Sequence, residues 1–314
     1  MEWSERMGRR IRLRDLHILI TVVQCKSLAK AAKHLAISRP VVSKAIVDLE
    51  HALGVRLLER DRHGAEPTVY GAALLKRGTA IFDELHGSVK DIEFLADPAA
   101  GDVRIGCHHF LATGFVSAVI DRLSRRYPRI VFHILASETE TLHRELNDRN
   151  VDFLVAWRFG PFADEQLGFE FLFDDSFVVA AGAQHPWARR RRAELAELAN
   201  EAWALPPPNS VLGSIKRQAF RASGLDYPRA TVFTVPAEVL ISQLATGRFL
   251  TIVPASVLKF PTKHREINVL PVKLPIVAVP IGIVTQTNRT LSPVARLFIE
   301  YAHEVAKPLA KWKR

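Results

Sequence analysis

The chain has 314 residues, a formal net charge of +10 and only two cysteines. Its length allows roughly two or three domains, and the excess of Lys and Arg favours a polyanionic partner. Cys25 and Cys107 fall in different expected domains, so neither a disulfide framework nor a cysteine-based metal site follows. The sequence contains no apolar run of about twenty residues and no signal-peptide core. We therefore expect a cytoplasmic protein without a membrane span.

The segment Leu13 to Arg60 predicts a helix-turn-helix: three short amphipathic helices with two tight breaks. We expect Ser27 to cap the second helix, where Ala31 and Ala32 are small enough to let the third helix cross closely. The apolar face of the first helix is predicted to consist of Leu13, Leu16, Ile20 and Val23.

The third helix has the features of a DNA-recognition helix. Ser38 is its expected cap, and Pro40 stands in the first turn, where a missing N–H has no cost. A helix N-terminus attracts phosphate, while Arg and small apolar side chains can read base edges in the major groove. The residues expected to face DNA are Ser38, Arg39, Pro40, Val41, Ser43 and Lys44. The alternative is an ordinary three-helix bundle with a polar outer face.

Residues 55–68 resemble a β-wing, with apolar pairs on either side of a charged turn. Arg60, Arg62 and His63 at its tip could reach phosphates or the minor groove, although a solvated hairpin is the simpler alternative. A proline-free helix then follows over residues 68–95. Its residues at alternating steps of four and three form a heptad seam, typical of a dimerisation helix, unless the helix packs on its own domain. The seam consists of Leu74, Gly78, Ile81, Leu85, Ser88, Ile92 and Leu95.

Strands and helices alternate from Gly101 onward, which predicts α/β lobes with parallel strands and crossover helices. Strands are expected at 103–106, 130–135, 151–156, 177–181, 204–205 and 249–253, with a late apolar run at 276–284. Helices are expected at 115–126, 139–150, 212–223, 236–246 and 292–306. Two such lobes leave a cleft between them.

Ligands of open α/β sheets bind beyond the carboxyl ends of the strands. This rule selects His108, His109, Glu138, Thr139, Trp157, Arg158, Ser210, Val211, Leu212, Thr234 and Glu238 as candidate effector-binding residues. Several of them stand at helix N-termini, which favour an anion, and Arg158 could hold a carboxylate. A capped helix end is the simpler explanation for Thr139, Ser210 and Thr234.

Metal binding and catalysis find little support. Adjacent His108 and His109 would point to opposite faces of a strand and make a poor metal site, and neither a third ligand nor a group to orient a Cys107–His dyad is evident. We therefore expect no metal, no cofactor and no enzymatic activity. The four arginines at 189–192 are interpreted as a solvated loop rather than a second DNA patch.

The chain resembles the LysR-type transcriptional regulators over nearly its whole length. The N-terminal pattern is met by Ala31-Ala32, Leu35, Ser38, Pro40, Ser43-Lys44, Leu49-Glu50, Gly54, Leu57, Arg60, Thr68 and Gly71. The C-terminal resemblance is carried by residues 103–106, 126–128, Leu146, Val151-Asp152, Gly247, Pro254 and 291–293. Arg39 replaces the usual Gln, Leu58 the usual Phe, and Ala112-Thr113-Gly114 the usual Leu-Pro.

The resemblance implies an α/β multidomain fold with a winged helix-turn-helix (1–70), a linker and dimerisation helix (71–97) and an effector-binding domain (98–314) similar to periplasmic binding proteins. Lobe I would comprise about 101–174 and 274–314, and lobe II about 175–273. The expected partners are double-stranded promoter DNA, a small organic anion, further copies of the chain in a dimer or homotetramer, and RNA polymerase. Two alternatives are an effector-independent DNA-binding protein and an enzyme with an accessory DNA-binding domain.

Overall fold

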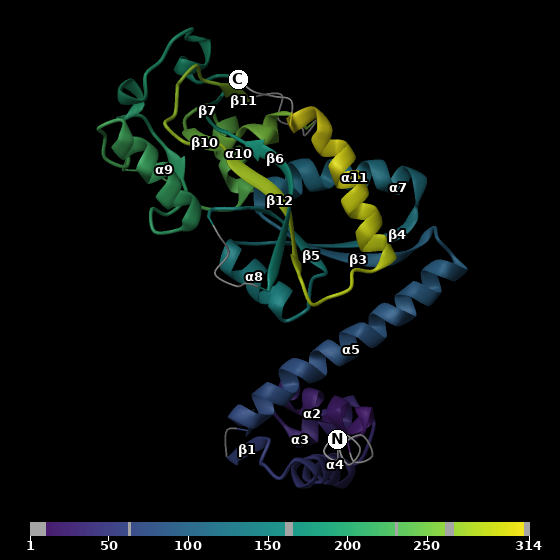
Figure 1. Cartoon of the computed structure of the whole chain (residues 1–314). Helices are drawn as coiled ribbons and strands as arrows, with labels where there is room; N and C mark the ends of the chain where they lie inside the picture. The colour runs from purple at the N-terminus through teal and green to yellow at the C-terminus, as the bar shows by residue number, and fades with distance from the viewer. Residues whose placement is uncertain (1–10, 62–63, 161–165, 230–231, 261–266, 311–314) are drawn as a thin grey trace. The chain divides into compact units, whose positions relative to one another are not determined.

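The computed structural model describes residues 11–61, 64–160, 166–229, 232–260 and 267–310, except for the side chains of residues 60, 61 and 310 (Figure 1). The chain forms two compact units, Met1–Ser88 and Val89–Arg314. Of the helices in the described ranges, none combines the length and the apolar character that crossing a membrane requires.

The first unit is built on a helix-turn-helix. Its helices are α2 (Leu13–Cys25), α3 (Leu28–His34) and α4 (Arg39–Leu53).

The Ser27 side chain accepts a hydrogen bond from the Lys30 N–H, which confirms the predicted cap of α3. Ser38 occupies the N-cap position of α4, as predicted, but its side chain makes no capping hydrogen bond. The predicted face of α2 was also displaced: Leu13 is 50% exposed, whereas Leu16, Ile18, Leu19 and Val22 are buried. The reason is that α3, α4 and the wing together cover a wide face of α2.

A two-stranded antiparallel wing follows, formed by β1 (Leu58–Asp61) and β2 (Gly64–Pro67). The helix α5 (Val69–Ala96) then runs for 28 residues, roughly 42 Å at 1.5 Å per residue. The Thr68 hydroxyl accepts from the Gly71 N–H and donates to the Arg56 carbonyl, which fixes the start of α5 against the wing. Gly78 packs on Leu16, because a Cβ there would lie 2.9 Å from the Leu16 side chain.

The second unit contains two lobes. The first lobe holds a five-stranded sheet in the order β4-β3-β5-β12-β6. Its strands are β3 (Ala100–Cys107), β4 (Arg129–Ala136), β5 (Phe153–Trp157), β6 (Leu167–Asp175) and β12 (Val279–Gln286). β3 is parallel to β4 and β5, as predicted, whereas β12 is antiparallel to both β5 and β6. No strand was predicted for 167–175, so β6 was missed.

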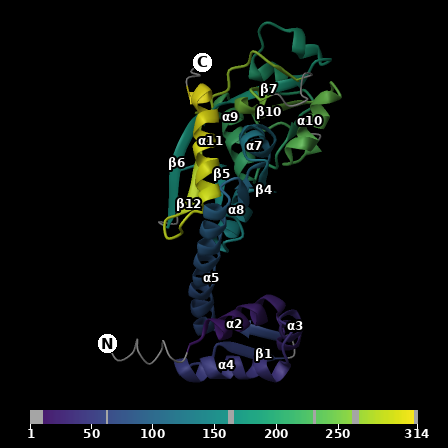
Figure 2. The same cartoon turned by 90° about the vertical axis from the view of Figure 1, so that its right-hand side faces the viewer.

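Helices cover both faces of this sheet (Figure 2). They are the short α6 (His109–Leu111), a π-helical turn (Ala112–Val116), α7 (Ser117–Arg126), α8 (Thr139–Asn147) and α11 (Pro293–Ala310). Phe298 of α11 packs with Phe153 and the main core on one face. On the other face, Leu142 and Leu146 of α8 form a separate cluster with β5 and β12.

The second lobe holds a three-stranded antiparallel sheet, β10-β7-β11, and a short parallel pair, β8-β9. Its strands are β7 (Phe177–Gly182), β8 (Ala204–Leu205), β9 (Val232–Phe233), β10 (Leu250–Pro254) and β11 (Ile267–Val269), and its α-helices are α9 (Val211–Ala222) and α10 (Ala237–Ala245). The chain enters this lobe after β6 and leaves it before β12. The main hydrophobic core contains residues of both lobes, so the lobes are packed against each other.

Candidate functional site

The outward face of α4 carries the side chains that were predicted to meet DNA. Ser38, Arg39, Pro40 and Lys44 are exposed and Ser43 is half-buried. Val41, an apolar side chain on the same face, is 38% exposed. Val42, Ala45, Ile46 and Leu49 are buried, so the helix divides into an inner apolar and an outer polar face. The outer face therefore offers hydroxyls, a guanidinium, an ammonium and a small apolar group on one rigid element.

The turn before α4 is held by backbone geometry. Ala36 has a φ of 54°, in the left-handed region that non-glycine residues rarely adopt. The Ile37 N–H donates to the Ala32 carbonyl, which closes the turn between α3 and α4. This tight connection fixes the angle at which α4 leaves the bundle.

Glu50, in the last turn of α4, connects this helix to the start of the wing. Its Oε1 accepts hydrogen bonds from the backbone N–H groups of Leu57 and Leu58, at 2.8 and 3.3 Å. This role of Glu50 was not predicted from the sequence. Of the predicted wing residues, Arg60 lies in β1 but its side chain is outside the described residues, as are Arg62 and His63 entirely.

In the second unit, polar groups gather at the carboxyl ends of β3 and β5, where the lobes meet. His108 follows β3 and is 3% exposed. Its Nε2 lies 3.0 Å from the Thr139 hydroxyl at the start of α8. Its Nδ1 is buried without a hydrogen-bond partner among the described residues. Burial, together with the charges of His143 and His109, lowers the pKa of His108 to about 3, so its ring is neutral.

A buried lysine from the second lobe faces the same region. Lys216 of α9 is 1% exposed, and burial lowers its pKa to about 7, an effect that Glu138 opposes. Glu138 precedes α8 and makes no side-chain cap to it. Burial raises the pKa of Glu138, while His109 and Lys216 lower it. The two lobes thus bring a cation and a half-buried carboxyl together.

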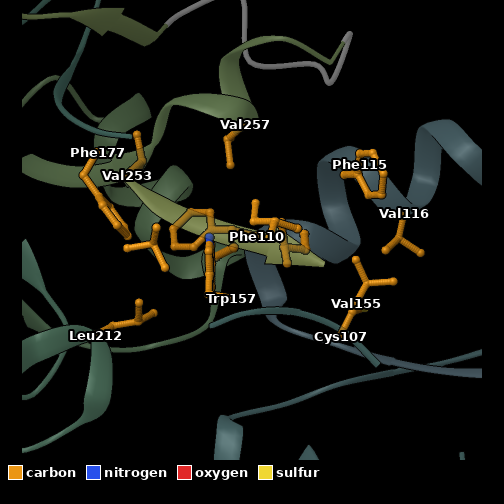
Figure 3. Packing of buried hydrophobic residues seen from close by; sticks show 14 of the residues in the cluster. Cys107, Phe110, Phe115, Val116, Val155, Trp157, Phe177, Leu212, Val253 and Val257 are labelled. Carbon is orange, nitrogen blue, oxygen red and sulfur yellow. The ribbon is translucent and has the colours of Figure 1, made fainter. Parts of the chain in front are cut away.

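Trp157 provides the apolar wall of this region. Its ring lies 4.8 Å from that of His108, and Figure 3 shows Leu212, Phe177 and Val253 of the second lobe around it. Asp175, at the end of β6, accepts from the backbone N–H and the hydroxyl of Ser256, at 3.0 and 2.6 Å. Burial raises the pKa of Asp175 to about 6, against the effect of these hydrogen bonds.

The remaining residues that were predicted to bind an effector have other hydrogen-bond partners or degrees of exposure. The Ser210 hydroxyl caps α9 by accepting from the Gly213 N–H, and it donates to the Pro207 carbonyl. Val211 and His109 are half-buried, while Glu238 is exposed on α10. Thr234 is half-buried, and its N–H donates to the Leu205 carbonyl.

Arg158 is exposed and lies over the Phe169 ring, 5.2 Å from its centre. Its Nε also donates to the Gly160 carbonyl. Successive side chains at a strand end point to opposite faces, so Arg158 and Trp157 diverge. The structure therefore does not bring Arg158 to the cluster around His108.

Lys216 and Asp175 were not predicted from the sequence. A signal for Lys216 was present, because Leu212, Lys216 and Phe220 follow each other at steps of four on the buried face of α9. A lysine within an apolar stripe indicates a buried lysine, which is rare in proteins unless the charge is paired. Within the described ranges, no group of three or more His, Cys, Asp or Glu side chains is arranged to hold a metal ion.

Two family models match this chain. Residues 13–72 match the bacterial regulatory helix-turn-helix protein, lysR family, and residues 96–307 match the LysR substrate binding domain. The chain belongs to the LysR family. It is a DNA-binding transcriptional regulator with a substrate-binding domain, and the fold class expected from the sequence is confirmed.

Curated relatives are similar over nearly the whole length of this LysR-family protein. The regulator GbpR of Azospirillum brasilense is 26% identical over 289 residues, which cover 91% of this chain and 84% of GbpR. The uncharacterized regulator YybE of Bacillus subtilis (strain 168) is 27% identical over 301 residues, covering 96% of this chain and 98% of YybE.

Solved structures share the fold. A full-length variant of OxyR from Pseudomonas aeruginosa has a TM-score of 0.68 and 20% identity, covering 97% of this chain and 99% of that protein. CbnR, a LysR family regulator, has a TM-score of 0.62 and 20% identity, with coverage of 94% and 99%. A structure of CbnR with its target DNA has a TM-score of 0.53 and 20% identity, with coverage of 94% and 100%.

Proposed function

We propose that this regulator is controlled by a small organic anion, held between the lobes by Lys216, Thr139 and His108. The observation that carries the proposal is the burial of Lys216, which is 1% exposed. A buried ammonium is costly unless a counter-charge and hydrogen bonds compensate it. Glu138 is only half-buried and itself carries a pKa raised by burial, so it compensates Lys216 incompletely. A carboxylate ligand would complete this compensation.

The neighbouring groups suit the same ligand. Thr139 is the first residue of α8, and the first N–H groups of a helix have no intrahelical acceptor and favour an anion. The free Nδ1 of the neutral His108 ring can donate to or accept from a further polar group. Trp157 supplies an apolar wall for the carbon skeleton. These features favour a carboxylate with at least one additional hydroxyl or carbonyl group.

A ligand between the lobes would act by population shift. Lys216 belongs to the second lobe and Thr139 to the first, so an anion that contacts both favours one lobe arrangement over another. In an oligomer, such a change alters the spacing of the DNA-binding units. The face of α5 that contains Ile81, Leu85, Ile92 and Leu95 is 44 to 80% exposed, which supports pairing with α5 of a second copy. A dimer of dimers is the assembly that we propose.

DNA binding through α4 completes the proposal. Arg39, Pro40 and Val41 would read base edges, whereas Ser38, Ser43, Lys44 and the wing would contact phosphates. The exposure of this face of α4 supports that assignment, and the related regulator CbnR was solved with its target DNA.

The effector proposal can be tested by thermal unfolding with a library of small carboxylates and their neutral amides. An acid at one hundred times its Kd should stabilise the folded state by about 2.7 kcal/mol, whereas its amide should have no effect. Lys216→Met should abolish the stabilisation. Arg296→Gln, which removes an exposed cation on α11, should retain it.

Two outcomes would contradict the proposal. If no acid raises the unfolding temperature, the region between the lobes is structural and the regulator acts without an effector. If amides stabilise as well as acids, and Lys216→Met still responds, the ligand is not recognised as an anion. Turnover of any ligand by the purified protein would instead favour an enzyme.

A further inference from the structure

A second basic site lies on the outer side of α9, away from the residues that face the lobe junction. A cavity of about 490 Å³ is lined there by Arg217, Arg221, Asp226, Tyr227, Arg229 and Phe233, together with two prolines. It shares no residue with the cluster around His108. Lys216 and Arg217 are adjacent in sequence, but Lys216 is buried and Arg217 is half-exposed.

The charge of this cavity is unbalanced, because three arginines line it beside one aspartate. Among the described residues, the guanidinium group of none of these arginines makes a hydrogen bond or ion pair. Arg217 and Arg221 are four residues apart on one helix, a spacing at which like charges destabilise it. Arg221 is partly explained by its place in the last turn of α9, where a cation favours the helix dipole. Arg217 and Arg229 have no such explanation.

Two aromatic residues, Tyr227 and Phe233, also line the cavity, and Tyr227 is held in place. The Tyr227 hydroxyl donates to the Pro206 carbonyl at 2.9 Å, and the Tyr227 ring meets Phe220 edge-on at 5.8 Å. Phe233 is 52% exposed, so one aromatic ring remains open to solvent beside the arginines. A planar ring can stack on such a surface.

We propose that this cavity binds a phosphate monoester that carries a planar ring, of the size of a mononucleotide. A phosphate monoester has a charge of about −2 at neutral pH, which matches three guanidinium groups and one carboxylate. Guanidinium groups bind phosphate oxygens bidentately, and Asp226 can accept a hydrogen bond from a ligand hydroxyl. A volume of about 490 Å³ is within the range of small-molecule sites, roughly 300–1,000 Å³.

The probe for this site is AMP, titrated calorimetrically into the full-length protein at low salt and pH 7.5. AMP should bind at least tenfold more tightly than adenosine, which lacks the phosphate, and than inorganic phosphate, which lacks the ring. The double variant Arg217→Gln/Arg221→Gln should weaken AMP binding at least tenfold, and Phe233→Ala should weaken it as well. Arg296→Gln removes an exposed arginine elsewhere and should not change the affinity. Circular dichroism verifies that each variant is folded.

Several results would overturn the proposal. It fails if AMP does not bind, or if inorganic phosphate binds as tightly as AMP. It also fails if the double variant keeps the wild-type affinity. Loss of AMP binding in Lys216→Met, with retention in the double variant, would place AMP between the lobes instead. This last comparison separates the present inference from the effector proposal, because each site is removed by its own substitution.

Discussion

The rings of His108 and Trp157 lie 4.8 Å apart, although 49 positions separate the two residues in the sequence. The contact arises because β3 and β5 are adjacent parallel strands. Their carboxyl ends therefore lie at the same edge of the sheet, where His108 follows β3 and Trp157 ends β5. His108 also lies 3.0 Å from the hydroxyl of Thr139, which follows β4, the other parallel neighbour of β3. The first-lobe part of the proposed effector site is therefore a product of parallel topology.

Substitutions on α4 should separate base reading from phosphate binding. Arg39→Ala should change the order of preference among DNA sites, because a guanidinium reads guanine edges. Lys44→Ala should weaken all sites alike and reduce the salt-dependence slope by about one, because it removes one phosphate contact. Selection of bound genomic fragments, followed by titrations at several salt concentrations, measures both effects. If both variants keep the wild-type preference and slope, α4 is not the recognition helix.

Charges on the exposed seam of α5 should disrupt self-association. Leu85 and Ile92 are 44% and 67% exposed and stand seven residues apart, as residues on one coiled-coil seam do. Leu85→Glu/Ile92→Glu should shift the protein towards the monomer in sedimentation velocity and weaken binding to a two-half-site DNA. The variant His86→Gln/Glu93→Gln, at exposed positions with the same spacing, serves as control. An unchanged oligomer in the glutamate variant would exclude pairing through this face.

Stability should depend on pH through Lys216. Its pKa falls from 10.5 to about 7 on folding. Between these values the unfolded chain binds more protons, so the Lys216 contribution to the unfolding free energy rises with pH. Lys216→Met should therefore be more stable than wild type at pH 7, by about 1–4 kcal/mol, and this advantage should shrink towards pH 10.

Urea denaturation at pH 7 and pH 10 measures this dependence. Lys307→Met, at an exposed position on α11, should show no comparable change with pH. A constant difference between wild type and Lys216→Met at both pH values would mean that Lys216 is not desolvated.

Two glycines of α5 should respond to alanine in opposite ways. A Cβ at Gly71 would lie 2.0 Å from the Leu57 carbonyl oxygen, whereas a Cβ at Gly87 meets nothing within 4 Å. Gly71→Ala should destabilise the first unit by about 1–3 kcal/mol through overpacking. Gly87→Ala should stabilise α5 by up to about 1 kcal/mol, because alanine is the better helix former. Equal effects in thermal unfolding would contradict the close approach of α5 to the wing.

The two cysteines should differ in reactivity. Cys107 is buried and its pKa is raised to about 12, because burial disfavours the thiolate. Cys25 is partly exposed. Since the thiolate is the reactive form, iodoacetamide should label Cys25 in the native protein and Cys107 only after unfolding, as peptide mass spectrometry would detect. Early labelling of Cys107 would indicate a redox-active thiol.

The sequence predicted the helix-turn-helix and the parallel part of the sheet because both depend on local periodicity. Val42, Ala45, Ile46 and Leu49 recur at helical spacing and are buried in the structure. The order of strands in the sheet, by contrast, could not be predicted from local periodicity. β12 lies between β5 and β6, and no local pattern specifies that a strand more than 120 residues after β5 pairs with it.

The candidate effector site was predicted only in part for the same reason. Strand-end logic identified His108, Thr139 and Trp157, which the structure brings together. It also selected Arg158, but successive side chains of a strand point to opposite faces, and Arg158 lies over the Phe169 ring instead. Lys216 reaches the region from the second lobe, so its role depends on how two lobes pack, which strand-end logic does not address.

The position of β12 has a consequence for synthesis on the ribosome. The first unit ends at Ser88, so its core can form while the remaining chain is still being translated. The sheet of the first lobe, by contrast, lacks an inner strand until Val279–Gln286 has emerged. For most of translation, the nascent chain therefore presents a completed DNA-binding unit ahead of the domain that regulates it.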